Sequence, residues 1–192
     1  MDTRSPLVLS THDLGRRAGS MRTYDLDVPA PDALAIEVVG VPAGSSMHLE
    51  LRLESVMDGI LVTGSADVAL AGECVRCLTA VTDELTVPFQ ELVYYSDVRD
   101  ARRRQDDDAE GEQVERYVLT GELLDLEQMV RDAVVLALPF QPLCRPDCPG
   151  LCPVCGIRLA EAGPDHAHDE TDPRWAALVG LLEDSGESPT TT

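Results

Sequence analysis

Apolar and polar residues alternate between Ile36 and Tyr95 with a period of two, which is typical of strands that have one solvated face. The clearest run alternates apolar Met47, Leu49, Leu51 and Leu53 with polar His48, Glu50, Arg52 and Glu54. Asp58-Gly59 is a sequence signal for a β-hairpin turn. The alternation then resumes in Ile60, Val62, Ala66, Val68 and Leu70, interrupted by Gly64, and again in Val81, Leu85, Val87 and Phe89. We predict at least three consecutive antiparallel strands, joined by an earlier strand around Ala35 to Val41.

A helical period follows in residues 121–140. Its apolar stripe consists of Leu126, Met129, Val130, Ala133, Val134, Ala137 and Leu138. Asp125 is a natural N-cap, and Pro139 ends the helix. Because strands with one apolar face need a covering element, the predicted fold class is α+β, with an antiparallel sheet of three to five strands covered by one long helix. A small C-terminal segment follows, with a short terminal helix that begins at Asp172-Pro173.

Charge limits the possible functions. The 192 residues include 35 acidic and 15 basic side chains, all of the latter Arg, which gives a net charge of −20. Without Lys, a Walker-type phosphate loop and a Schiff-base lysine are excluded. Tight direct binding of RNA or DNA is disfavoured, and a basic protein partner suits the chain better. Residues 97–120 contain a run of Arg followed by many acidic residues; we predict a mobile loop, with a docking segment for a basic partner as the alternative.

The apolar stretches are shorter than the roughly 18 residues that a membrane helix needs, and Met1 to Pro6 do not have the composition of an export leader. We therefore expect a cytoplasmic protein with no membrane partner.

Six cysteines form three close pairs, Cys74-x2-Cys77, Cys144-x3-Cys148 and Cys152-x2-Cys155. For a chain expected inside the cell, this spacing favours metal or redox chemistry over structural disulfides. His166 and His168 follow in a polar segment without a hydrophobic period. These eight donors are enough for two tetrahedral zinc sites.

The spacing leaves the pairing of ligands open. One alternative places Cys74, Cys77, Cys144 and Cys148 on one ion and Cys152, Cys155, His166 and His168 on another. The other alternative places the four later cysteines on one ion and leaves Cys74 and Cys77 as a redox pair. We expect one or two zinc ions with a structural role, because four protein ligands leave no open position for a catalytic water.

One pattern imitates an enzyme. His48-Leu49-Glu50, followed by Cys74-x2-Cys77, is similar to the signature of zinc deaminases. Position 73 is Glu where that signature has Pro, and His48 and Glu50 lie on the wet face of a predicted strand. We therefore expect no catalytic residues and a protein that is not an enzyme.

Four segments together resemble the YceD family, also called large ribosomal RNA subunit accumulation proteins. They are Gly72 to Leu78, the helix end Ala133 to Pro139, the cysteine run Cys144 to Gly156, and Asp172-Pro173-Arg174-Trp175. The resemblance implies a cytoplasmic bacterial protein that is needed for accumulation of 23S rRNA. Many members have Cys-x-Cys where this chain has His166-Ala167-His168, which exchanges one pair of zinc donors for another.

The leading hypothesis is a non-enzymatic assembly factor that binds a large-subunit ribosomal protein or an assembling pre-ribosomal particle. One alternative is a redox-responsive zinc switch, in which Arg76 and Arg145 favour thiolates. Another is a direct binder of 23S precursor RNA through Arg16-Arg17 and Arg102 to Arg104.

The predicted organisation is a mainly antiparallel β region in 1–96, the acidic loop in 97–120, and the core helix in 121–140. A zinc-binding segment with the short helix follows in 141–184, and a disordered tail in 185–192.

Overall fold

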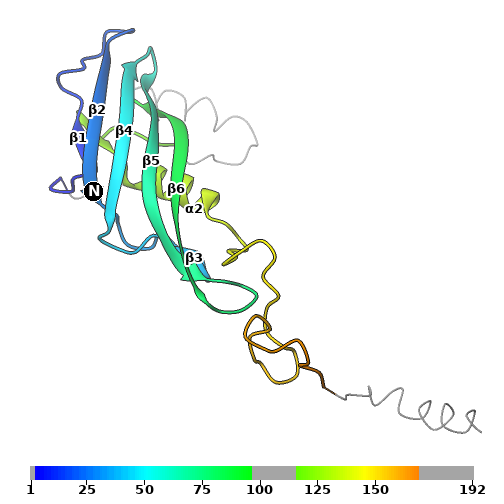
Figure 1. The fold of residues 1–192 in the computed structure, drawn as a ribbon. Helices are drawn as coiled ribbons and strands as arrows, with labels where there is room; N and C mark the ends of the chain where they lie inside the picture. The colour runs from blue at the N-terminus through cyan, green and yellow to red at the C-terminus, as the bar shows by residue number, and fades with distance from the viewer. Residues whose placement is uncertain (1–2, 97–115, 169–192) are drawn as a thin grey trace, which may run out of the picture. The chain divides into compact units, whose positions relative to one another are not determined.

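The structure is a computed structural model that describes residues 3–96 and 116–168 (Figure 1). It divides into two compact units, Met1–Cys148 and Pro149–Thr192, which are described separately below as unit 1 and unit 2. No helix in the described ranges combines the length and the apolar character needed to cross a membrane.

A five-stranded antiparallel sheet is the main feature of unit 1 (Figure 1). Its strands are β2 (Met21–Pro29), β3 (Val39–Gly40), β4 (Ser46–Ser55), β5 (Gly59–Glu73) and β6 (Ala80–Tyr94). The central strand β5 pairs with β4 along Ile60 to Val68 and with β6 over its full length. β2 pairs with the other side of β4, and the short β3 pairs with Ala71 and Gly72 near the end of β5.

A smaller two-stranded sheet joins β1 (Val8–Ser10) to β7 (Leu123–Asp125). The chain passes directly from β7 into α2 (Glu127–Ala137), and the amide of Leu126 donates a hydrogen bond to the Leu7 carbonyl. This pairing fixes the start of the helix beside the N-terminal strand.

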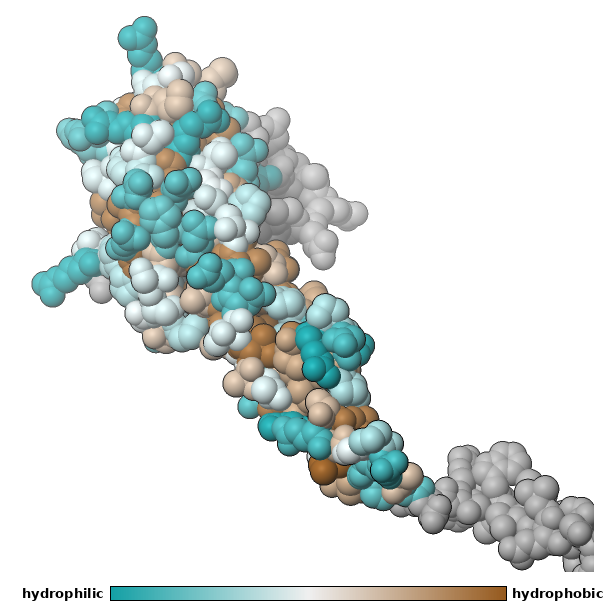
Figure 2. Space-filling view, viewed as in Figure 1, coloured by the Kyte–Doolittle hydropathy of each residue, from teal (hydrophilic) through white to brown (hydrophobic). Residues whose placement is uncertain are grey.

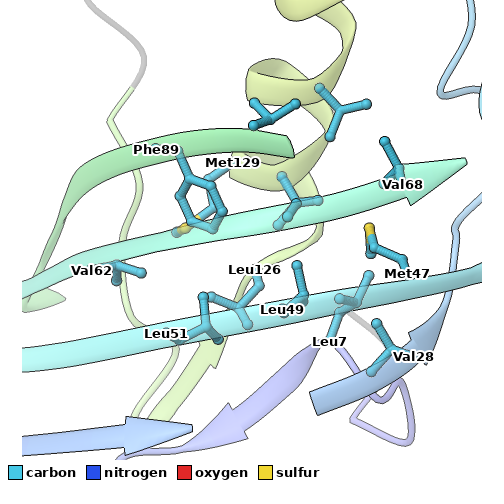
Figure 3. Close-up of a cluster of buried hydrophobic side chains, with 14 of the residues drawn as sticks. Leu7, Val28, Met47, Leu49, Leu51, Val62, Val68, Phe89, Leu126 and Met129 are labelled. Atoms are coloured by element: carbon cyan, nitrogen blue, oxygen red, sulfur yellow. The ribbon is translucent and has the colours of Figure 1, made fainter. Parts of the chain in front are cut away.

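The core of unit 1 lies where the apolar face of the sheet meets α2. In β4, Met47, Leu49, Leu51 and Leu53 are buried, and the residues between them are exposed or half-buried, as the alternation predicts. Met129, Val130 and Val134 are the buried residues of α2. Figure 3 shows Met129 beside Phe89 of β6, within the same apolar cluster as Leu49 and Leu51. Each buried side chain of this size stabilises the fold by about 1.5–3 kcal/mol.

The expected α+β fold, with a long helix covering the sheet, is wrong. Strands account for 42% of the residues that the structure describes, and the helix α2 among them has only 11 residues. Residues 121–126 do not join the helix, because Leu123 to Asp125 form β7 and pair with β1. The N-cap is Leu126 and not the predicted Asp125, although the Asp125 carboxylate accepts a hydrogen bond from the Glu127 amide. At the other end, Leu138 is extended, the conformation favoured before a proline.

Other sequence predictions differ from the structure in extent. The strand expected around Ala35 to Val41 is reduced to Val39–Gly40, with an isolated bridge between Ala35 and Gly40. Of the predicted loop 97–120, only 116–120 are described, and Val118 bridges to Tyr94 there. The helix predicted from Asp172 and the tail from 185 lie outside the described residues.

Candidate metal centres

The first cysteine group lies in unit 1, beyond the ends of β5 and α2. Cys74 directly follows β5, Cys77 lies in the turn that leads to β6, and Cys144 and Cys148 belong to the segment after α2. The four sulfurs lie within 4.8 Å of one another. Cys74 Sγ is 3.8 Å from Cys148 Sγ, and Cys77 Sγ is 3.6 Å from Cys144 Sγ. All of these thiols are buried except Cys144.

Backbone hydrogen bonds hold the Cys74–Cys77 turn. The Leu78 amide donates to the Cys74 carbonyl, and Leu78 adopts a positive φ of 58° that closes the turn. The Val75 amide donates to the Pro142 carbonyl, which ties this turn to the segment after α2. The Arg76 guanidinium donates to the Cys148 carbonyl over 3.0 Å. Residues about 70 positions apart in the sequence are therefore fixed against each other beside the sulfurs.

The surroundings of these thiols favour ionisation of some and oppose it in others. Burial disfavours the Cys74 thiolate, but amide hydrogen bonds from Cys144, Arg76 and Cys77 outweigh burial and lower the Cys74 pKa to about 6. The Thr79 hydroxyl lowers the pKa of Cys77. The neighbouring sulfurs of Cys148 and Cys77 raise the pKa of Cys144 to about 12. A bound cation stabilises clustered thiolates, so this pattern suits a metal site.

The second group lies in unit 2 and is local in sequence. Its donor atoms, from Cys152, Cys155, His166 and His168, also lie within 4.8 Å of one another. Cys155 Sγ is 3.6 Å from His166 Nε2, which is 3.1 Å from His168 Nε2. Cys152 is buried, His166 is half-buried, and the other two are exposed.

The turn at Cys152 repeats the hydrogen bonding of the first turn. The Gly156 amide donates to the Cys152 carbonyl, and Gly156 has a φ of 73°, which glycine adopts without strain. The Cys152 amide donates to the Ile157 carbonyl. The Cys155 amide and the His166 ring lower the pKa of Cys152 to about 6.

Both groups fit one tetrahedral ion each. With metal–sulfur bonds of about 2.3 Å and metal–nitrogen bonds of about 2.0–2.1 Å, tetrahedral geometry separates two sulfurs by about 3.8 Å, a sulfur and a nitrogen by about 3.6 Å, and two nitrogens by about 3.4 Å. The sulfur separations of 3.8 and 3.6 Å and the sulfur–nitrogen separation of 3.6 Å agree with these values, and the His166–His168 nitrogen separation of 3.1 Å is slightly shorter. A disulfide would instead bring two sulfurs to about 2.05 Å. Each group could therefore bind a metal ion.

These two sets of four are the groups of the first pairing alternative given by the sequence. All eight predicted ligands, Cys74, Cys77, Cys144, Cys148, Cys152, Cys155, His166 and His168, belong to one of them. Ligation of a metal by these residues stays a prediction.

The deaminase-like residues lie elsewhere. His48 Nδ1 is 3.0 Å from an Asp27 carboxylate oxygen and 3.8 Å from one of Asp25, across the pair of β4 and β2. The hydrogen bond with Asp27 raises the pKa of His48. Neither His48 nor Glu50 belongs to a cysteine group. Their position on β4 gives them neighbouring carboxylates in place of thiolates.

The arginines invoked for a redox switch also have structural partners. Arg76 donates to the carbonyl of Cys148, and Arg145 lies 3.4 Å from Asp147. In the first group, backbone amides, the Thr79 hydroxyl and neighbouring sulfurs lower the pKa values of Cys74 and Cys77, and neither arginine side chain is among the causes.

Comparison with known proteins places this geometry in a family context. The family model described as large ribosomal RNA subunit accumulation protein YceD matches residues 62–182. This range contains all eight residues of the two groups. An uncharacterized protein of Mycobacterium tuberculosis (strain ATCC 25618 / H37Rv) is 44% identical over 178 residues, which cover 93% of this chain and 82% of that relative. An uncharacterized protein of Mycobacterium leprae (strain TN) is 40% identical, covering 93% and 78%. No solved structure matches the chain.

Proposed function

Because the chain belongs to the YceD family of large ribosomal RNA subunit accumulation proteins, we propose that it is a non-enzymatic factor that supports 23S rRNA accumulation and assembly of the large ribosomal subunit. The family match over residues 62–182 is the observation that carries this proposal. The role is cytoplasmic, since the large subunit is assembled there in bacteria.

Zinc in this proposal has a structural role. The donor chemistry, four thiolates in one group and two thiolates with two imidazoles in the other, suits zinc. In the first group the ion would cross-link the β5–β6 turn to the segment after α2. In the second it would hold the loop from Cys152 to His168. Four protein ligands leave no position for substrate or water, which supports a role without catalysis.

The partner in this proposal is a basic large-subunit ribosomal protein or a pre-ribosomal particle. The chain has a net charge of −20 and a sequence pI of about 4.3. Such a charge attracts a basic protein and repels RNA phosphates, so contact through protein is favoured over contact through RNA.

The test uses cells depleted of this protein and complemented with variants. We expect depletion to lower the ratio of mature 23S to 16S rRNA and the free large subunits in sucrose gradients. The wild-type chain restores both. Cys74→Ser does not, because it removes a buried sulfur of the first group.

Val75→Ser is the matched control, since Val75 adjoins Cys74 but is 38% exposed. It should restore both readouts. An unchanged rRNA ratio and unchanged gradients on depletion would contradict the proposed function. Full rescue by Cys74→Ser would show that the first cysteine group is not needed for the proposed function.

A further inference from the structure

The five-stranded sheet has a second face, opposite the core, that the described residues leave solvated. The alternation that buries the apolar residues of β4 turns His48, Glu50 and Arg52 to this side. In Figure 1, α2 lies behind the sheet, and Figure 2 shows that the face toward the viewer is largely hydrophilic. We call this the outer face; it consists of Thr23, Asp25, Asp27, His48, Glu50, Arg52, Glu54, Thr63, Ser65 and Asp67.

Acidic side chains dominate the outer face. It carries the five carboxylates of Asp25, Asp27, Glu50, Glu54 and Asp67. The outer face has two groups that can be cationic. They are the Arg52 guanidinium, which lies 3.8 Å from Glu54, and the His48 ring, which lies 3.0 Å from Asp27. The face is therefore strongly negative, and its cationic groups already have acidic neighbours.

The strand register places two of these carboxylates directly opposite each other. Asp25 of β2 is the cross-strand partner of Glu50 on β4, and their row continues with Ser65 and Pro88. Like charges at opposed positions destabilise a sheet. The row itself contains no cation, and the His48 ring of the adjoining row lies 3.8 Å from Asp25. A basic side chain supplied from outside would relieve the repulsion that remains.

A shallow hollow of about 530 Å³, open to solvent, lies between two cross-strand rows of this face. Asp25, Glu50 and Ser65 line one side of it, and Thr23, Arg52 and Thr63 line the other. It crosses β2, β4 and β5, which gives an incoming side chain a place against the backbone of the sheet.

We propose that the outer face is the docking surface for an extended, Arg- or Lys-rich segment of a protein partner. This inference rests on the proposed function, which calls for a basic partner, and it names where that partner binds. Alternate residues of a strand are about 6.8 Å apart, so two basic residues at alternate positions of an extended segment match the spacing of the two neighbouring acidic rows, one with Asp27 and Asp67 and one with Asp25 and Glu50. The same charge repels the phosphates of RNA.

The binding test uses the full-length, metal-loaded chain and a fluorescein-labelled twelve-residue peptide of alternating Arg and Ser, measured by fluorescence anisotropy. The variant is Asp25→Asn with Glu50→Gln. The control is Glu37→Gln with Glu91→Gln, which changes the net charge equally at two exposed positions outside the outer face. We expect the outer-face variant to bind about fivefold more weakly, the effect of two exposed ion pairs, and the control to bind like the wild type.

Thermal unfolding separates binding from folding. Removal of the opposed charges should leave the melting temperature of the outer-face variant equal to or above that of the wild type. Equal weakening of peptide binding in the variant and the control would overturn the proposal, because it would show attraction to net charge alone.

Complementation of depleted cells distinguishes this inference from the proposed function. The outer-face variant should restore the ratio of 23S to 16S rRNA less well than the control variant does. Full rescue by the outer-face variant would overturn the docking surface while the function stands. If depletion does not lower the ratio, the proposed function itself fails, whatever the peptide experiment shows.

Discussion

A buried hydrogen bond joins the ends of two strands that do not pair with each other. Ser55 is the last residue of β4, and Tyr95 directly follows β6. Ser55 Oγ and Tyr95 Oη are 2.9 Å apart. Ser55 is fully buried and Tyr95 is 5% exposed, so neither hydroxyl has ready access to water as a substitute partner.

Removal of one hydroxyl should therefore cost more than the net value of an average hydrogen bond. Tyr95→Phe leaves Ser55 Oγ buried without its partner, which costs about 1–3 kcal/mol. The Arg16 guanidinium lies 4.4 Å from the centroid of the Tyr95 ring, and a Phe ring preserves this contact. We predict a loss of about 2 kcal/mol, which lowers the melting temperature by roughly 4–8 °C for a domain of this size.

The assay is urea unfolding of the metal-loaded chain, followed by circular dichroism, for Tyr95→Phe, Ser55→Ala and the double variant. The double variant leaves no unpaired hydroxyl, so it should be about 1–2 kcal/mol more stable than the sum of the single losses predicts. Tyr24→Phe is the control, because no hydrogen bond joins its hydroxyl to the described residues; its effect should stay within about 0.5 kcal/mol. Additive single losses would show that the two hydroxyls are not coupled, contrary to this prediction.

Three further predictions concern the sheet, its histidine and the metals. Gly64→Ala places a Cβ against the Glu50 carbonyl oxygen of β4 and should destabilise the chain by about 1–3 kcal/mol in urea, whereas Gly163→Ala, with open space around it, should have little effect. The hydrogen bond with Asp27 raises the pKa of His48 above 6.5. The stability that protonated His48 gives to the folded chain is therefore complete below pH 6.5 and is lost as the pH rises through the raised pKa. The stability difference between wild type and Asp27→Asn should shrink from pH 5.5 to 8.5, and a folded-state pKa at or below 6.5 by NMR would contradict this. Among residues 149–168 only Gly150 and Cys152 are buried, so this segment has little core to hold it without metal. Chelation of the metal should therefore remove the chemical-shift dispersion of its backbone amides in NMR spectra, while the circular dichroism signal of the sheet persists. Persistent dispersion in a metal-free sample would count against it.

The sequence was most informative where one face of a strand is buried. In β4 each apolar residue from Met47 to Leu53 is buried, because a pattern of period two allows only one assignment of faces. The strand β2 was missed, although Tyr24, Leu26 and Val28 alternate there with exposed residues. Its inward side chains are only partly buried at Tyr24 and Leu26, and edge strands give this weaker signal.

The length of the helix was beyond local reasoning. Leu126, Met129, Val130, Val134 and Leu138 of the apolar stripe are buried in the core, whereas Ala133 is half-buried and Ala137, near the end of the helix, is exposed. What the pattern could not show is that Leu123 to Asp125 pair with Val8 to Ser10, more than 100 residues earlier. A pairing between segments this far apart does not change the local spacing of apolar residues, so the sequence pattern cannot reveal it. The pairing shortens the helix at its start.

The cysteine groups show the same division. The spacing of each pair indicates metal chemistry from the sequence alone, because a short turn presents two sulfurs to one ion. Which pairs share an ion depends on the Val75–Pro142 hydrogen bond and on the path of the chain after α2, and these are properties of the fold.

We expect the two separate four-ligand groups to bind one zinc ion each. Native mass spectrometry of the purified full-length chain measures this most directly. We predict two zinc ions per wild-type chain, one in Cys74→Ser and one in Cys152→Ser, because the groups share no ligand. A wild-type chain that binds no zinc, or a single ion that both substitutions abolish, would contradict it.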